Sequence, residues 1–290
     1  MSKNRKMNKI FFKKKLIIGT ANFTQKYGTS NKKLRLNEIK KILDLGNKNK
    51  INSLDTAASY LSDNSFFKKS NKKFKLISKI KPDIRWSSYS YCKKKLELQI
   101  KKLNNKIEIL LFHDIDILYK KEGKKIFNNI KLLKKNGFFK KIGISIYNPN
   151  CLSYLISKYD IQVVQCPYNI LDKRIISSGW FSKLKKKGIE VHARSIFLQG
   201  ILANEELYKK KYFNKWHNQF FKWFQNLKKN NISSIDYCIN DILNYDFDKI
   251  IIGIDNYENL RDIINFKNIK KKKIRLKIND LKLIDPRNWK

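Results

Sequence analysis

The sequence predicts a single closed (β/α)8 barrel, the TIM-barrel architecture of the α/β class. Eight short apolar runs alternate along the chain with longer amphipathic, lysine-rich runs. Glycines such as Gly137 and Gly188 stand at the junctions between these runs, where the chain has to turn. The chain has 290 residues, of which 42% are hydrophobic, and this is enough for one sizeable core. Strands that alternate with helices favour parallel βαβ units, and eight units in a chain of this length fit a closed barrel.

The apolar runs predict eight strands, which are Leu16–Thr20, Ile51–Asp55, Phe74–Lys79, Ile107–His113, Lys141–Ser145, Ile161–Cys166, Ile189–Ala193 and Lys249–Gly253. The amphipathic runs predict helices over Leu36–Lys48, Tyr89–Leu103, Gly123–Asn136, Pro149–Lys158, Lys173–Lys187, Phe213–Asn230 and Asn256–Phe266. Residues 1–13 are interpreted as a basic N-terminal tail, with Phe11–Phe12 as a candidate hairpin strand, and residues 14–290 as the barrel domain. An open, doubly wound sheet is the alternative, but it requires a GxGxxG turn after the first strand, and residues 19–28 do not match that pattern.

Charge is the most unusual property of the composition, because 65 Lys and Arg against 24 Asp and Glu give a formal net charge of +41. Such a charge makes a nucleic-acid-binding protein one alternative function. However, the lysines are spread over nearly every predicted helix and linker, and Arg, the residue suited to bidentate contacts, is scarce. Lys, Asn, Ile, Phe and Tyr share A/T-rich codons, so codon bias explains the same composition. We therefore expect no specific nucleic-acid partner, but an attraction for anionic ligands.

Cysteine usage and hydropathy indicate a cytoplasmic protein. The four cysteines are far apart and form no CxxC pair, which is typical of reduced thiols; they are Cys92, Cys151, Cys166 and Cys238. No apolar stretch approaches the ~20 residues that a membrane-spanning helix needs.

Four polar residues stand at the ends of neighbouring predicted strands, where the active sites of such barrels lie. Asp55 ends the second strand, with Tyr60 shortly after it, Lys79 ends the third, and His113 ends the fourth. Taken singly, each has an ordinary structural interpretation, such as a helix cap, a half-buried aromatic, a solvated lysine or a core histidine. Their joint position favours a catalytic set.

The chemistry of this set fits carbonyl reduction. An ammonium ~4 Å from a phenol, at an effective dielectric of ~20, favours the phenolate by ~4 kcal/mol, or about three pKa units. Lys79 is expected to act on Tyr60 in this way, while Asp55 holds Lys79 charged. His113 would donate a hydrogen bond to the carbonyl oxygen, and Tyr60 would protonate that oxygen as hydride reaches the carbon.

The segments around these residues, Ser53–Tyr60, Ile77–Ile80 and Leu110–Asp114, resemble the catalytic motifs of the aldo-keto reductases. The resemblance covers nearly the whole chain and implies a (β/α)8 barrel that binds NADP(H) without a Rossmann motif. It also implies that Tyr60, Lys79, Asp55 and His113 are the catalytic residues of an NAD(P)H-dependent carbonyl reductase or alcohol dehydrogenase.

Further segments imply a cofactor site. Ser145 and Gln165 match the residues that contact the nicotinamide carboxamide, and the segment from Ser195 through Leu198 to Gly200 resembles the loop over the pyrophosphate. The turn after the last strand resembles the adenosine site. The cofactor-binding residues implied by the resemblance are Ser145, Gln165, Arg194, Ser195, Leu198, Gly200, Gly253, Asp255, Asn256 and Asn259.

The sequence departs from the family pattern at three places. Ile146 stands where many members carry an Asn, and Arg194 stands where an aromatic ring stacks on the nicotinamide. The resemblance implies NADP(H) as the cofactor. The turn at Asp255 lacks the Lys and Arg that clasp a 2′-phosphate, and this makes NAD(H) the alternative. Two phrases, Arg194–Gly200 and Asp285–Trp289, resemble a bacterial subgroup linked to surface-polysaccharide or nucleotide-sugar metabolism.

Substrate size is predicted from the loops. The segment between His113 and the helix at Gly123 is short, and the tail after Phe266 is modest, so we expect an open mouth with positive flanks. Such a mouth favours a polar or anionic carbonyl substrate, for example a sugar or a nucleotide-linked sugar.

Two other functions are alternatives. A catalytically silent regulatory barrel conflicts with the intact set of four residues. A metal hydrolase built on His113, Asp114 and Asp116 would have a thin ligand set, so no metal is expected.

Overall fold

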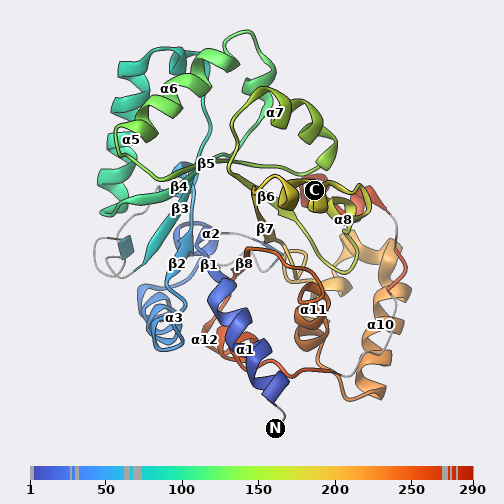
Figure 1. Cartoon of the computed structure of the whole chain (residues 1–290). Coiled ribbons are helices and arrows are strands. Elements are labelled where there is room, and N and C mark those ends of the chain that lie inside the picture. The colour runs from blue at the N-terminus through green and yellow to red at the C-terminus, as the bar shows by residue number, and fades with distance from the viewer. Residues whose placement is uncertain are drawn as a thin grey trace.

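The chain folds as the predicted barrel (Figure 1). The structure is a computed structural model that describes residues 3–26, 28–29, 33–61, 66–67, 74–269, 274, 276–278 and 280–289. Eight parallel strands pair in sequence order, and the first closes on the last. The strands are β1 (Leu16–Gly19), β2 (Ser53–Asp55), β3 (Lys75–Ile80), β4 (Ile107–Phe112), β5 (Lys141–Ser145), β6 (Val163–Pro167), β7 (Glu190–Arg194) and β8 (Lys249–Gly253).

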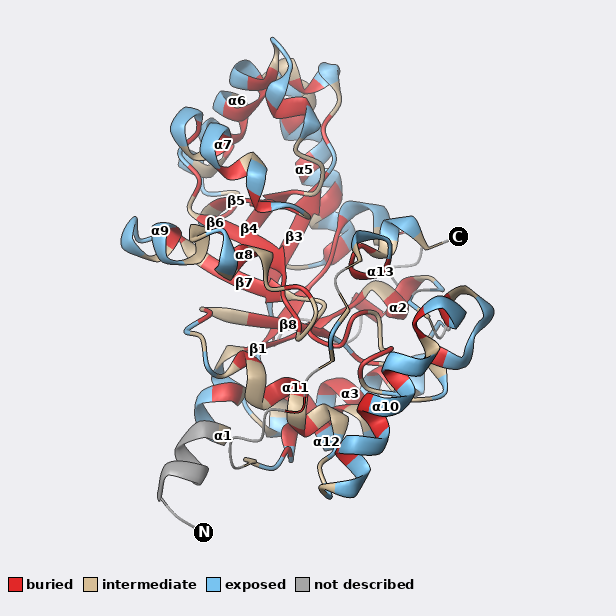
Figure 2. Cartoon of the chain, turned by 90° about the vertical axis from the view of Figure 1, so that its right-hand side faces the viewer, coloured by how far each residue is buried: buried red, intermediate tan, exposed pale blue. Residues whose placement is uncertain are grey.

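Helices connect successive strands and cover the barrel from outside. In Figure 2 the strands are almost wholly buried, whereas the helices expose one face and bury the other. The α-helices are α1 (Lys3–Lys15), α2 (Ala21–Thr24), α3 (Leu36–Lys48), α5 (Tyr89–Leu103), α6 (Gly123–Lys135), α7 (Leu152–Lys158), α8 (Arg174–Ser177), α9 (Trp180–Lys186), α10 (His217–Lys229), α11 (Ser234–Ile242), α12 (Tyr257–Ile264) and α13 (Leu281–Ile284). Single 3-10 turns at η1 (Ala58–Tyr60) and η4 (Asp116–Tyr119) follow β2 and β4 and lie near the candidate site.

The prediction of one helix over Lys173–Lys187 was wrong, because that segment forms two helices, α8 and α9. Gly179 between them has a φ of 74°, in the left-handed region that ends a helix. Helix α11 was not predicted at all. Its signal was present, since Ser233 caps the helix by accepting a hydrogen bond from the Ile235 amide.

The N-terminal segment differs from the expected tail and hairpin strand. Residues 3–15 form helix α1, and Phe12 on it is fully buried against the ring of Phe266, with centroids 5.1 Å apart. Lys249 at the start of β8 donates a hydrogen bond of 3.2 Å to the Lys14 carbonyl. The physical reason is that this stretch contains no Gly or Pro and that one aromatic side chain is enough to anchor it.

The core has two layers. A small cluster from the strands alone fills the barrel interior and consists of Ile17, Ile77, Leu111, Val163 and Ile251. A much larger cluster packs the outer strand surface against the helices. Gly143 on β5 is required where these strands approach, because a Cβ there would lie 2.3 Å from the Val163 carbonyl oxygen and 2.6 Å from a methyl of Leu111.

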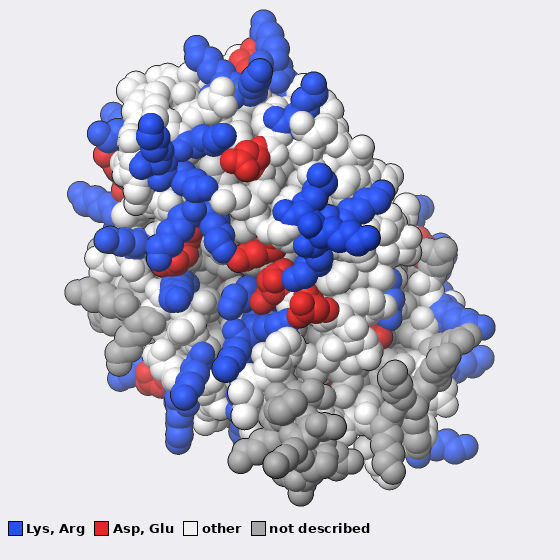
Figure 3. All heavy atoms as spheres, viewed as in Figure 1, with Lys and Arg blue, Asp and Glu red and all other residues white. Residues whose placement is uncertain are grey.

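Lys and Arg side chains are scattered over the visible face of the molecule, with acidic side chains between some of them rather than a single basic stripe (Figure 3). In the described parts of the chain, no helix combines the length and the apolar character needed to cross a membrane.

Candidate active site

A cavity of about 310 Å³ opens at the carboxyl ends of the strands. Every strand contributes a residue to its lining, either within its last three positions or directly after its end: Gly19, Asp55, Lys79, His113, Ser145, Gln165, Arg194 and Gly253. Its volume lies at the lower end of the range for small-molecule sites. The barrel therefore brings together side chains that are isolated in the sequence.

Lys79 and Asp55 form a buried ion pair at the bottom of this cavity. Their side chains are 4% and 8% exposed. The Lys79 Nζ donates to Asp55 Oδ1 and also, at 3.2 Å, to the Thr56 carbonyl. Burial lowers the pKa of Lys79, while the charge of Asp55 and its hydrogen bond oppose that change. Pairing with Asp55 therefore stabilises the charged ammonium of Lys79 at its buried position.

The second oxygen of Asp55 faces the residues expected to hold a nicotinamide. Gln165 Nε2 donates to Asp55 Oδ2 at 2.8 Å, and Ser145 Oγ lies 3.5 Å from Gln165 Oε1. These hydrogen bonds form a chain from β3 through β2 and β6 to β5. Asp55 therefore connects the candidate catalytic residues to the candidate cofactor residues.

The rings of Tyr60 and His113 are in edge-to-face contact in the lining of the cavity. Their ring centroids are 6.0 Å apart and the rings are nearly perpendicular, at 87°. Burial, followed by the charge of Lys79, lowers the pKa of His113 from 6.5 to about 4. The imidazole is therefore neutral at pH 7 and carries one N–H for donation. The backbone amide of His113 bonds the Ile80 carbonyl at 2.7 Å, so the residue stays aligned with β3.

All but one of the expected cofactor residues line the cavity. The residues found in the lining are Ser145, Gln165, Arg194, Ser195, Gly200, Gly253, Asp255, Asn256 and Asn259. Leu198 is fully buried in the core and is not in that lining. Its side chain packs in the core, and a contact between this residue and the cofactor stays a prediction.

The loop after β7 has an unusual backbone. Ser195, Leu198 and Gln199 have φ values of 63°, 45° and 56°, which are rare for residues with a Cβ. The loop after β1 meets it, since Thr29 Oγ1 donates to the Gln199 carbonyl at 2.6 Å. Strained conformations of this kind tend to occur at functional sites, where the surrounding structure imposes them.

At the β8–α12 turn the cavity wall is polar and acidic. Asn256 caps α12 by accepting a hydrogen bond from the Asn259 amide at 2.7 Å. Asn22 donates to the Ile254 carbonyl at 2.6 Å and to Asp255 Oδ1 at 3.1 Å. The only cationic side chains among the described lining residues are Lys79 and Arg194, at the opposite, catalytic end.

Several lining residues were not identified from the sequence. They lie in loops whose course no motif fixes, and they are Thr20, Asn22, Gly28, Tyr147, Asn204 and Leu207. Tyr147 had a usable signal, because it stands two residues after Ser145, which was expected to contact the nicotinamide. The described residues contain no group of three or more His, Cys, Asp or Glu side chains placed to hold a metal ion.

The profile of the family described as the Aldo/keto reductase family matches residues 15–282. Among solved structures, the chain is similar to an aldo-keto reductase from Bacillus halodurans in its holo form, with a TM-score of 0.67 and 20% identity over 87% of this chain and 85% of that chain. It is also similar to a thermostable aldo-keto reductase in complex with the inhibitor epalrestat, with a TM-score of 0.65 and 19% identity over 89% of this chain and 91% of that chain. At these identities the structural likeness shows the fold. No curated protein matches the chain.

Proposed function

Because the chain belongs to the aldo/keto reductase family, whose members are NAD(P)H-dependent oxidoreductases acting on carbonyls, we propose that Tyr60 is the proton donor of its reaction. The observation that carries this proposal is the meeting of Tyr60 and His113 with the buried Lys79–Asp55 pair in one cavity. These residues are separated in the sequence, and the fold brings them together.

Tyr60, Lys79 and His113 each have a separate role in carbonyl reduction, and Asp55 holds Lys79 in place. When bound, the reduced nicotinamide cofactor supplies the hydride. Tyr60 transfers its phenolic proton to the carbonyl oxygen, and the Lys79 ammonium stabilises the phenolate that remains. His113, neutral because its pKa is about 4, donates an N–H hydrogen bond to the same oxygen and orients it.

The residues on the cavity wall suit a nicotinamide dinucleotide, and we assign NADP(H) or NAD(H) to them. Ser145 and Gln165 would hold the carboxamide, with Gln165 fixed by its bond to Asp55. Ser195 and Gly200 lie along the path for the pyrophosphate. The turn at Gly253, Asp255, Asn256 and Asn259 would border the adenosine. Arg194 borders both the nicotinamide position and the substrate position.

The proposed substrate is a polar or anionic carbonyl compound, such as a sugar or a nucleotide-linked sugar. Two cations, Lys79 and Arg194, stand in the catalytic end of the cavity, and the net charge of the chain is +41. A small apolar aldehyde would gain little from such a surface, whereas an anion would be attracted to it. The scattered basic side chains support no specific nucleic-acid partner.

A cytoplasmic location is also proposed. Its support is that Cys92, Cys151, Cys166 and Cys238 are all free thiols, which fits a reducing compartment.

The test is turnover by the purified protein, followed as loss of the reduced nicotinamide absorbance. Aldehydes, ketoses and nucleotide-sugar ketones are offered with NADPH and with NADH. Tyr60→Phe should lower kcat on the order of 10²–10⁴-fold and leave the Kd for the reduced cofactor nearly unchanged. Turnover by Tyr60→Phe at the wild-type rate would reject Tyr60 as the acid.

A further inference from the structure

Arg194 differs from neighbouring cationic side chains in whether a carboxylate balances its charge. Lys79 pairs with Asp55, Arg174 with Asp172, and Arg287 with Asp285. Within the described residues, no carboxylate forms an ion pair with Arg194, although its side chain is half-buried in the cavity lining. A guanidinium in this position is suited to an anion that the protein itself does not supply.

The guanidinium of Arg194 is held in a fixed orientation. One terminal nitrogen donates to the Ile146 carbonyl at 3.0 Å and the other donates to Ser195 Oγ at 3.3 Å. The central carbon of the group lies 4.2 Å from the centroid of the Tyr147 ring. A guanidinium carries five N–H donors, so the two bonds found leave others for a ligand. Because its orientation is already fixed, little entropy is lost when a ligand binds.

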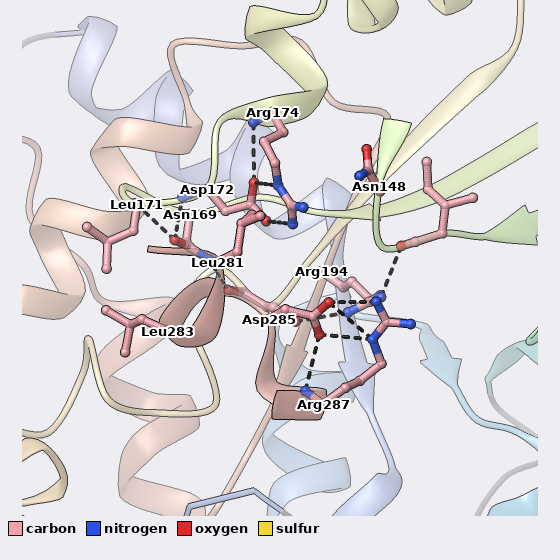
Figure 4. A network of polar contacts seen from close by, with 12 residues as sticks. Asn148, Asn169, Leu171, Asp172, Arg174, Arg194, Leu281, Leu283, Asp285 and Arg287 are labelled. Carbon is pink, nitrogen blue, oxygen red and sulfur yellow. Dashed lines mark hydrogen bonds and ion pairs between the residues drawn. The ribbon is translucent and has the colours of Figure 1, made fainter. Parts of the chain in front are cut away.

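A second guanidinium reaches the same tyrosine from the C-terminal segment. Arg287 lies 3.8 Å from the centroid of Tyr147 and is fixed by its Nε and Nη2 bonds to Asp285. The segment is anchored by Trp289, which donates to the Leu283 carbonyl at 2.9 Å and packs on Phe213. Figure 4 shows Arg194, Asp285 and Arg287 close together. The tail therefore packs on Tyr147, a residue that lines the cavity.

The position of Arg194 limits where its ligand lies relative to the reacting carbonyl. Arg194 lines the same cavity as Lys79 and His113, and its charge contributes to lowering the pKa of both. An anionic group bound there would therefore lie beside the carbonyl, a few bonds away from it. Arg287 contacts the same Tyr147 ring but is paired with Asp285, so among the described residues the charge available to a ligand at this position comes from Arg194.

We propose that Arg194, oriented by Tyr147 and assisted by Arg287, binds a phosphate group of the carbonyl substrate. This inference rests on the proposed function and names a phosphorylated carbonyl compound as the substrate class. Arg194 is the specificity-determining residue, and Asp285 and Tyr147 are positioning residues that act through the two arginines.

The test compares two substrates that differ by the phosphate alone, glyceraldehyde 3-phosphate and glyceraldehyde. The quantity measured is the ratio of their kcat/KM values. Arg194→Gln should lower this ratio about 10–100-fold, the range expected for losing charge-assisted hydrogen bonds. Arg287→Gln should lower it less. Arg85→Gln is the matched control, because it removes the same charge from an exposed arginine outside the cavity, and it should leave the ratio unchanged.

A measurement of cofactor affinity distinguishes binding of the substrate phosphate by Arg194 from a contact between Arg194 and the nicotinamide. The Kd for NADH, measured by fluorescence, should change much less in Arg194→Gln than the substrate ratio does. An equal loss for both substrates, or a loss of NADH affinity of the same size, would overturn the inference. If wild-type protein reduces glyceraldehyde but gains nothing from the phosphate, the inference fails while the reductase function stands. If it oxidises neither cofactor with any aldehyde, the function itself fails.

Discussion

Gln165 Nε2 donates a 2.8 Å hydrogen bond to Asp55 Oδ2, while Lys79 occupies Oδ1 of the same carboxylate. Both oxygens of a buried acid are thus satisfied, one by a candidate catalytic residue and one by a candidate cofactor residue. A change at any of the three should therefore affect stability as well as activity, because it leaves a buried charged or polar group without its partner.

Replacement of Lys79 should have the largest combined effect on stability and activity. Lys79→Met leaves Asp55 charged and buried without its cation, and loss of one partner of such a pair costs about 3–5 kcal/mol in the free energy of unfolding. Urea unfolding measures this cost, and steady-state turnover should fall in parallel. Lys81→Met is the control, since Lys81 pairs with Asp114 at the surface and is 73% exposed. If both variants unfold at the wild-type urea concentration, the pair has no structural role.

The pH dependence of stability should report on His113. Burial, then Lys79, lowers the pKa of the folded imidazole from 6.5 to about 4. As the pH falls below about 6.5, the unfolded imidazole binds a proton. The folded imidazole stays neutral until about pH 4, so the unfolded state binds more protons in this window. The free energy of unfolding should therefore decrease as pH is lowered from 7 toward 4.

Urea titrations at pH 7 and pH 5 on wild type and His113→Asn measure this effect. The variant has no imidazole at this position, so its loss of stability between the two pH values should be smaller than that of wild type. Identical losses in the two proteins would mean that the imidazole titrates normally in the folded state.

Cofactor preference should respond to a single added charge at the β8–α12 turn. Asn259 lines the cavity beside Asp255, and its backbone amide already bonds the Asn256 cap. Asn259→Arg should increase the affinity for NADPH relative to NADH by about tenfold, because a guanidinium there can bind a 2′-phosphate. Asn259→Gln, which adds no charge, is the control. Fluorescence titration gives both Kd values, and an unchanged ratio would place the 2′ position elsewhere.

The strands and the four strand-end residues were predictable because two simple rules act together. Buried parallel strands are apolar runs, and their carboxyl ends meet at one face, so Asp55, Lys79 and His113 had to be neighbours. These rules could not predict the contact between Tyr147 and Arg287. Their contact depends on how a tail far along the chain folds back, and that is set by packing at Trp289 rather than by local pattern. The break between α8 and α9 was missed because a single residue, Gly179, decides it. Helix α1 was missed because a single buried residue, Phe12, anchors it.

Helix α1 has a practical consequence through the placement of the two ends of the chain. Phe12 fixes the N-terminal helix beside the end of α12 and the start of β8, on the side of the barrel away from the cavity. Arg287, by contrast, packs on Tyr147, which lines the cavity. An affinity tag or surface tether joined before α1 should leave the catalytic mouth open to solution. The same tether joined after Trp289 would emerge beside the entering substrate and compete with it for space.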